Sequence, residues 1–218
     1  MHCLLVASTA AEITPFTEHL AGTEKLDHID FDIDILITGV GSNAATYNLT
    51  RYLQVKRPDL VIQAGVAGCF SAKTNLGTVF AVTHDVFADQ GVQEKSGFRD
   101  IFDLKLASPN ELPYKKGVLA NPYGSMVKRT RLKKARAVTV NEITTQKKKS
   151  AYYIEKYRAE VESMEGASLH FVCLQEEITF LQIRCISNLV GERNKKKWNL
   201  PLAIENLNKE LIRLLESL

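Results

Sequence analysis

Two glutamates and one asparagine occupy positions at which the side chains of an α/β protein commonly meet a small ligand. Glu12 follows the short apolar run 3–7, Asn188 follows the apolar run 179–186, and Glu165 begins an apolar segment that continues to residue 175. A carboxylate can orient or deprotonate water and can stabilise a developing cation, whereas an amide donates and accepts hydrogen bonds without an acidic proton. Because ligands of open α/β sheets bind at the carboxyl ends of strands, these three side chains are candidates for one site.

Two glycine-rich segments also follow apolar runs. Their sequences are Thr38-Gly39-Val40-Gly41-Ser42 and Ala64-Gly65-Val66-Ala67-Gly68. The first lacks the third glycine of a dinucleotide-binding motif, and neither is followed by the lysine of a P-loop. Taken alone, each is better explained by a tight turn than by a phosphate-binding loop. Glu165 alone is likewise explained by the helix dipole, which favours an acidic residue at a helix start by about 0.3–1 kcal/mol.

The elements that must position these residues alternate along the chain. We predict strands at 3–7, 33–37, 60–62, 78–86, 117–120, 137–140 and 179–186. We predict helices at 10–21, 165–175 and 201–218, and one more that Ser42 or Asn43 caps and that ends at residue 55, before Pro58. The polar segment 88–116 is expected to be a long excursion from the core. This alternation predicts a single three-layer α/β domain over residues 1–218, with a mixed, mostly parallel central sheet flanked by helices.

The composition excludes several classes of protein. The 218 residues are 45% hydrophobic and 24% charged, and 28 Lys and Arg against 25 Asp and Glu leave a formal charge of +3. The chain is too apolar for a disordered protein, has no apolar run of about 20 residues for a membrane span, and begins without the features of a signal peptide. Its scattered cysteines and histidines form no metal-binding pattern, so we expect buried thiols, no metal site and a cytoplasmic location.

Three basic stretches raise the alternative of a nucleic-acid-binding protein. They lie at 128–136, 147–149 and 195–197. None is part of an RNP, zinc-finger or helix-turn-helix signature, and short basic runs are typical of solvated surfaces. We therefore expect neither a nucleic acid nor a membrane as a partner.

Several motifs together resemble the purine nucleoside phosphorylase and nucleosidase superfamily over nearly the whole chain. They are the segment 6–12, the glycine turns at 39–41 and 64–68, Glu162-Ser163-Met164-Glu165-Gly166-Ala167, and Arg184-Cys185-Ile186-Ser187-Asn188. The segment 187–193, with Trp198 shortly after it, is most similar to the branch that hydrolyses futalosine for menaquinone biosynthesis, a relative of the methylthioadenosine/S-adenosylhomocysteine nucleosidases. The resemblance implies a nucleoside phosphorylase/hydrolase-like fold, a nucleoside as substrate, no cofactor, and a homo-oligomer (a dimer or higher) in which 88–116 is a candidate interface.

The resemblance also implies catalytic roles. Cleavage of an N-ribosidic bond passes through a ribosyl cation, and requires an anion near the sugar, a positioned water or phosphate, and a hold on the base. By resemblance, Glu165 accepts hydrogen bonds from the ribose hydroxyls and favours the cation, Met164 packs on the sugar, and Glu12 orients and deprotonates water. Asn188 stands where adenine-cleaving relatives have an aspartate that protonates N7. An amide instead can donate to the 6-oxo group of hypoxanthine, although a flipped amide could accept from a 6-amino group.

Five more residues are implied as substrate contacts, namely Val66, Ala67, Ile143, Trp198 and Arg193. Trp198 is expected to stack on the 5′ substituent of futalosine, or alternatively to anchor its own loop. Arg193 is the first of several nearby cations that could meet the carboxylate of that substituent.

The sequence favours hydrolysis over phosphorolysis. Gln63 stands near the position at which hexameric phosphorylases carry an arginine, and no arginine lies between Val6 and Phe16. A phosphate site without these guanidinium groups would lose its charge-assisted contacts. The alternatives left open are a nucleosidase or phosphorylase acting on inosine, uridine or adenine nucleosides, and a protein that binds nucleosides without turning them over.

Overall fold

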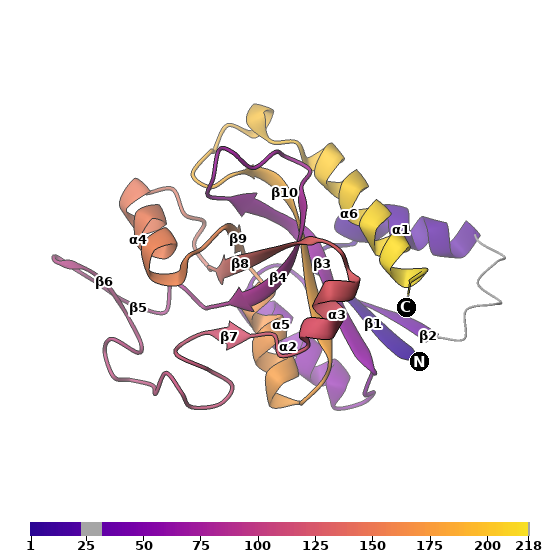
Figure 1. Cartoon of the computed structure of the whole chain (residues 1–218), viewed down its shortest axis with the longest axis horizontal. Coiled ribbons are helices and arrows are strands. Elements are labelled where there is room, and N and C mark those ends of the chain that lie inside the picture. The colour runs from indigo at the N-terminus through magenta and orange to yellow at the C-terminus, as the bar shows by residue number, and fades with distance from the viewer. Residues whose placement is uncertain (23–31, 218) are drawn as a thin grey trace.

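The computed structural model describes residues 1–22 and 32–217 and is built around a mixed sheet (Figure 1). The strands are β1 (His2–Ala7), β2 (Asp32–Ile37), β3 (Leu60–Cys69), β4 (Val79–Asp85), β5 (Gly91–Glu94), β6 (Gly97–Asp100), β7 (Leu119–Ala120), β8 (Lys133–Thr139), β9 (Val161–Ser163) and β10 (Phe180–Leu189). The helices are α1 (Ala10–Gly22), α2 (Ser42–Leu53), α3 (Gly124–Arg129), α4 (Lys147–Tyr157), α5 (Gly166–Gln175) and α6 (Leu200–Leu215), with a short 3₁₀ helix η2 (Lys195–Lys197).

The central sheet brings together the strand ends that carry the candidate residues. Its order is β10-β4-β8-β9-β3-β1-β2, with β7 paired to β4, and β10 also pairs with β3. Because β10 pairs with both β4 and β3, the five strands β10, β4, β8, β9 and β3 form a closed ring. The pairs β1–β2, β1–β3, β3–β10, β4–β8 and β8–β9 are parallel, whereas β4–β10, β3–β9 and β4–β7 are antiparallel. The predicted mixed, mostly parallel sheet is confirmed, and the carboxyl ends of β1, β3 and β10 lie at one edge.

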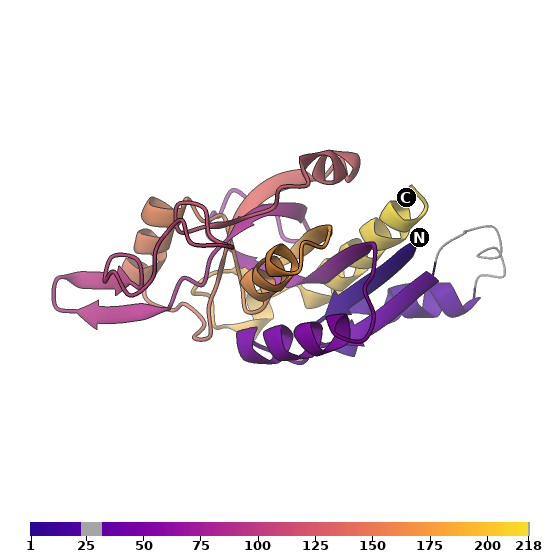
Figure 2. The same ribbon diagram turned by 90° about the horizontal axis from the view of Figure 1, so that it is seen from below.

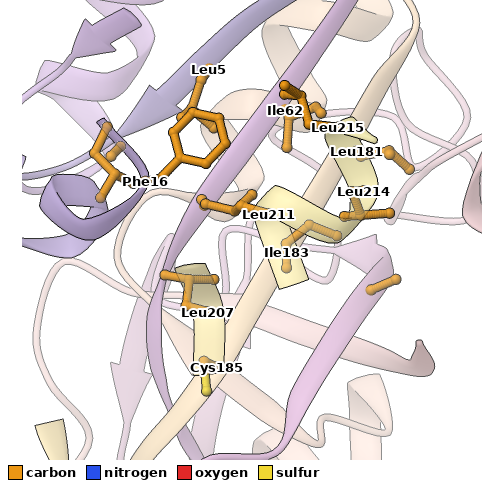
Figure 3. Packing of buried hydrophobic residues seen from close by; sticks show 14 of the residues in the cluster. Leu5, Phe16, Ile62, Leu181, Ile183, Cys185, Leu207, Leu211, Leu214 and Leu215 are labelled. Carbon is orange, nitrogen blue, oxygen red and sulfur yellow. The ribbon is translucent and has the colours of Figure 1, made fainter. Parts of the chain in front are cut away.

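Helices cover both faces of the sheet, as the prediction of a layered α/β fold requires. On one face, α1 and α6 bury an apolar cluster against the strands, in which Phe16 of α1 and Leu211 of α6 pack near Leu5, Ile62 and Ile183 (Figure 3). On the other face, α2 and α5 pack against the sheet through a second cluster that includes Leu49, Leu169 and Phe180. The hairpin β5–β6 projects from the end of the molecule opposite to both termini (Figures 1 and 2).

Most predicted elements are present, with shifted boundaries. Strand β3 does not end at a glycine turn but continues through residues 64–68 to Cys69, because β10 pairs with it along that whole length. Backbone hydrogen bonds from a neighbouring strand thus extend a strand whose own side chains are poor strand formers. The prediction that Ser42 or Asn43 caps α2 was wrong. Gly41 is the N-cap, and the Ser42 hydroxyl donates to Asn141 Oδ1 instead.

Several elements were not predicted. The basic stretch 128–136 contains the end of α3 and the first part of β8, and the polar excursion contains the β5–β6 hairpin. Helix α4 and strand β9 were also missed. Residue 218 of the predicted last helix lies outside the described residues.

All four cysteines are buried and free, as predicted. Burial raises the pKa of the Cys3 and Cys185 thiols to about 12, so both are neutral. Within the described part of the chain, no helix combines the length and the apolar character that crossing a membrane would need.

Candidate active site

A cavity of about 210 Å³ opens at the carboxyl ends of β1, β3 and β10. It is lined by all nine residues that the sequence indicated: Glu12, Val66, Ala67, Ile143, Met164, Glu165, Asn188, Arg193 and Trp198. These residues are spread over most of the chain, and the sheet order brings them together because β1, β3 and β10 are neighbours.

Glu12 lies in the first turn of α1 and is 7% exposed. One carboxylate oxygen accepts hydrogen bonds from the Ser8 hydroxyl and from the Thr9 N–H (3.1 Å) and hydroxyl (3.2 Å), and the other accepts from the Val66 N–H (3.0 Å). The side chain therefore bridges the end of β1 to β3. A β-carbon on Gly65 would lie 3.0 Å from this carboxylate and would overlap the guanidinium of Arg184, so this close approach requires glycine.

Glu165 is the residue before α5, at its N-cap position, but its side chain does not cap the helix. It instead reaches across to the first glycine-rich turn, where Oε1 accepts the N–H of Gly41 (2.9 Å). Gly41 has φ +93°, a conformation that L-residues rarely adopt, and this orients its N–H toward the carboxylate. The turn thus orients the Glu165 carboxylate, and this contact accounts for Gly41 without a bound phosphate.

A buried arginine that we did not assign from the sequence stands behind Glu165. Arg184 of β10 is 1% exposed, and its Nη1 lies 3.8 Å from Glu165 Oε2. Its Nη2 donates to Gln63 Oε1 (2.7 Å), and Gln63 Nε2 donates to the main-chain oxygen of Glu165 (3.3 Å). Gln63 therefore braces the arginine and Glu165 from inside the protein, and it does not line the cavity. An arginine within the otherwise mostly apolar run 180–186 was the signal that could have identified it.

A second buried network supports the start of α5. Asp85 of β4 is fully buried and accepts hydrogen bonds from Gln182 Nε2 (3.0 Å), the Thr139 hydroxyl (3.0 Å) and the Val86 N–H (2.8 Å). The Thr139 oxygen also accepts the N–H of Ala167, in the first turn of α5 (2.7 Å). Burial raises the pKa of Asp85 to about 6, despite these donors. The network holds the helix end that follows Glu165.

Asn188 lies near the end of β10, beside an irregularity in the pairing of β10 with β3. The Ser187 hydroxyl donates to its Oδ1 (2.8 Å), and its Nδ2 donates to the main-chain oxygen of Leu189 (2.9 Å). These contacts orient the amide and leave one Nδ2 hydrogen for a ligand.

The loop 192–198 lines one side of the cavity through Glu192, Arg193 and Trp198. Trp198 Nε1 donates to the main-chain oxygen of Glu192 (2.9 Å), the Arg193 guanidinium lies 5.7 Å from the centre of the indole, and Lys197 forms an ion pair with Glu192 (2.8 Å). Trp198 is therefore an anchor of its loop as well as a wall of the cavity.

Two other features of the described residues lie outside this cavity. A larger groove of about 760 Å³ runs along α2 and contains no carboxylate among its lining residues, which are Ser42, Asn43, Thr46, Tyr47, Thr50, Arg51, Phe87, Gln90, Tyr114 and Phe171. His2, Asp32 and Asp34 lie close enough together to hold a metal ion, but Lys56 already pairs with both aspartates (3.3 and 2.7 Å). A cation there would compete with this lysine.

Known proteins share sequence and fold with this chain. A family model described as the phosphorylase superfamily matches residues 32–216. A futalosine hydrolase of Thermus thermophilus is 26% identical to this chain, in an alignment that covers 83% of this chain and 80% of the relative. A 5′-methylthioadenosine/S-adenosylhomocysteine nucleosidase of Bacillus subtilis is also 26% identical, in an alignment that covers 89% of this chain and 88% of the relative. The superposition on the solved structure of futalosine hydrolase from Helicobacter pylori covers all of this chain and 98% of the other chain, with a TM-score of 0.81 at 17% sequence identity. That structural likeness shows a shared fold.

Proposed function

The chain belongs to the phosphorylase superfamily, and we propose that it hydrolyses the N-ribosidic bond of futalosine, releasing hypoxanthine and dehypoxanthine futalosine in menaquinone biosynthesis. The observation that carries this proposal is a cavity in which two buried carboxylates, Glu12 and Glu165, are each held in place by the protein's own donors. Curated relatives that are futalosine hydrolases support the choice of substrate.

The two carboxylates have different tasks in this proposal. Glu165 accepts hydrogen bonds from the ribose hydroxyls, and its negative charge stabilises the ribosyl cation as the bond to the base breaks. Met164, the preceding residue, packs on the sugar. Glu12 receives a proton from the attacking water, and its hydrogen bonds to Thr9 and Val66 fix the carboxylate in one orientation before the substrate arrives.

The charges around the cavity support water as the nucleophile. Among the described residues that line it, Arg193 is the only lysine or arginine, and its guanidinium lies over the Trp198 indole. Arg184 is committed to Gln63 and Glu165, and Gln63 lies behind the cavity wall. A phosphate dianion would meet carboxylates and would lack the bidentate arginine contacts that such anions require.

Release of free base from purified protein tests the function. We expect hypoxanthine from futalosine at a rate that added phosphate does not change, because water supplies the nucleophile. Inosine and methylthioadenosine are the comparison substrates, because the similar protein of Bacillus subtilis is a 5′-methylthioadenosine/S-adenosylhomocysteine nucleosidase. Phosphate-dependent release, or faster release of adenine than of hypoxanthine, would contradict the proposal.

The choice of base is tested at Asn188. An aspartate can protonate a departing adenine at N7, whereas an asparagine cannot. Asn188→Asp should therefore raise the ratio of kcat/KM for methylthioadenosine to that for futalosine by roughly tenfold or more, if the acid contributes only part of the usual 100- to 10,000-fold of general acid catalysis. Asn194→Asp, in the neighbouring loop, is the control. An unchanged or increased preference for hypoxanthine in Asn188→Asp would contradict this role.

We further propose that the protein is a homo-oligomer in a reducing, cytoplasmic compartment. The α2 groove is lined by aromatic side chains, among them Phe87, Phe171 and the exposed Tyr47, and by Gln90 and Tyr114 of the segment 88–116. Such a patch is typical of a protein interface. The four free thiols support the compartment. Light scattering that gave the mass of a single chain would contradict the assembly.

A further inference from the structure

A buried asparagine joins the last helix to the helix that carries Glu12. Among the buried residues described in α6, Asn208 alone is polar, and it is 2% exposed. The helices α1 and α6 otherwise meet through apolar side chains, Phe16 and Leu211 among them. An amide buried in such a place is unfavourable unless hydrogen bonds satisfy it, so its partners indicate its role.

The side-chain amide of Asn208 bonds to two backbone groups of α1 that a regular helix would join to each other. Its Oδ1 accepts the N–H of Phe16 (3.0 Å), and its Nδ2 donates to the main-chain oxygen of Glu12 (2.9 Å). In an α-helix the N–H of each residue donates to the carbonyl four residues earlier, which makes these two groups partners. Nδ2 also donates to the main-chain oxygen of Ile204 in α6 (2.6 Å). A flipped amide would set its NH₂ against the Phe16 N–H, so only this orientation satisfies all three contacts.

A proline beside this contact explains why α1 needs support from another helix. Pro15 lies inside α1 and has no N–H, so the carbonyl of Ala11 receives no hydrogen bond from it. Proline inside a helix weakens the turn before it, and here that turn carries Glu12. The Asn208 amide therefore gives α1 a donor and an acceptor next to the place where its own hydrogen-bond ladder is interrupted.

Glu12 is thus held at its backbone as well as at its carboxylate. The Val66 N–H and the other donors described above fix the carboxylate, and Asn208 fixes the main-chain oxygen. We propose that Asn208 is a positioning residue that acts through Glu12: its amide sets the place of the first turn of α1, and with it the distance from the carboxylate to the attacking water. This inference rests on the proposed function, in which Glu12 takes a proton from that water. A displacement of about 1 Å at a reacting group can cost about 100-fold in rate.

Alanine at position 208 removes the amide without weakening α6, because alanine is the better helix former. We expect Asn208→Ala to lower kcat for futalosine hydrolysis by about 10- to 100-fold while KM changes little, since the contacts to base and ribose remain. Asn206→Ala is the matched control. It removes an amide of the same helix whose Nδ2 donates to the main-chain oxygen of Gly77 (2.8 Å), outside α1, and it should keep the wild-type kcat.

A double-mutant cycle separates positioning from a general loosening of the fold. In a Glu12→Gln protein no carboxylate is left to misplace, so adding Asn208→Ala should lower kcat no further. A purely structural role would lower kcat by the same factor in both backgrounds.

Amide resonances report the place of the carboxylate without turnover. The N–H groups of Thr9 and Val66 both donate to the Glu12 carboxylate, so their proton shifts should move in Asn208→Ala and stay in place in Asn206→Ala. In the wild-type protein the side-chain NH₂ of Asn208 should exchange slowly with solvent, because it is buried and bonded to two carbonyls. That measurement decides the inference even if Asn208→Ala does not fold.

Four results would each overturn the inference. They are full kcat in a folded Asn208→Ala protein, equal losses of kcat with and without the Glu12 carboxylate, unmoved resonances of Thr9 and Val66, and rapid exchange of the Asn208 NH₂. The proposed reaction fails in a different way. A wild-type protein that does not cleave futalosine would refute that reaction, whereas the resonances and the exchange rate would still decide whether Asn208 places the carboxylate.

Discussion

Replacing Glu12 with glutamine is expected to lower kcat for futalosine hydrolysis by about 100- to 10,000-fold while KM changes little. The physical reason is that an amide cannot take a proton from the attacking water, whereas the contacts to base and ribose remain. The measurement is initial-rate release of hypoxanthine by Glu12→Gln and by the wild type.

Two controls make this result specific. Glu18→Gln changes an exposed glutamate on the same helix and should retain wild-type activity. A melting curve of Glu12→Gln is needed as well, because its amide NH₂ would face either the Thr9 N–H, which holds one carboxylate oxygen together with the Ser8 and Thr9 hydroxyls, or the Val66 N–H that holds the other. A well-folded Glu12→Gln protein that hydrolysed futalosine at the full rate would show that water is activated elsewhere.

Replacing Glu165 with glutamine is expected to lower kcat by about 100- to 1,000-fold, the usual cost of removing one electrostatic contact to a transition state. Its carboxylate is the anion nearest to the developing ribosyl cation in our proposal. The substitution also leaves the buried guanidinium of Arg184 without its carboxylate, so we expect a lower melting temperature as well.

The loss of activity and the loss of stability can be separated. Arg184→Met removes the buried cation and keeps the Glu165 carboxylate, so it shows the cost of breaking the ion pair alone. Glu177→Gln is the matched control, because it alters an exposed glutamate just beyond the other end of α5. If Glu165 acts on the sugar, hypoxanthine should bind to Glu165→Gln with its normal affinity although turnover is lost. Normal kcat in a folded Glu165→Gln protein would remove Glu165 from the mechanism.

Parts of the fold and site were predictable because they depend on residues close together in the chain. The apolar runs that became β1, β2, β4 and β10 and the periodic segments that became α1, α5 and α6 carry their own signal of strand or helix. Glu12 and Asn188 follow or end such strands, so their position at the carboxyl edge of the sheet followed from the pattern alone.

Other elements could not be predicted because they are stabilised by distant partners. Strand β9 has three residues, too few for any periodicity, and exists because β3 and β8 pair with it on either side. The extension of β3 through its glycines similarly depends on β10. In both cases the hydrogen-bonding partner lies tens of residues away in the sequence.

The sequence by itself determined which chemical groups are available, namely the carboxylates of Glu12 and Glu165 and an amide at Asn188 in place of an acid. Only the tertiary structure decided what surrounds them. Arg184 became the buried partner of Glu165, and Gln63 became the brace between them, because the register of β3 and β10 sets which side chains meet. Side-chain identity is local, but the hydrogen-bond supply of a buried group depends on the packing of strands that are remote in sequence.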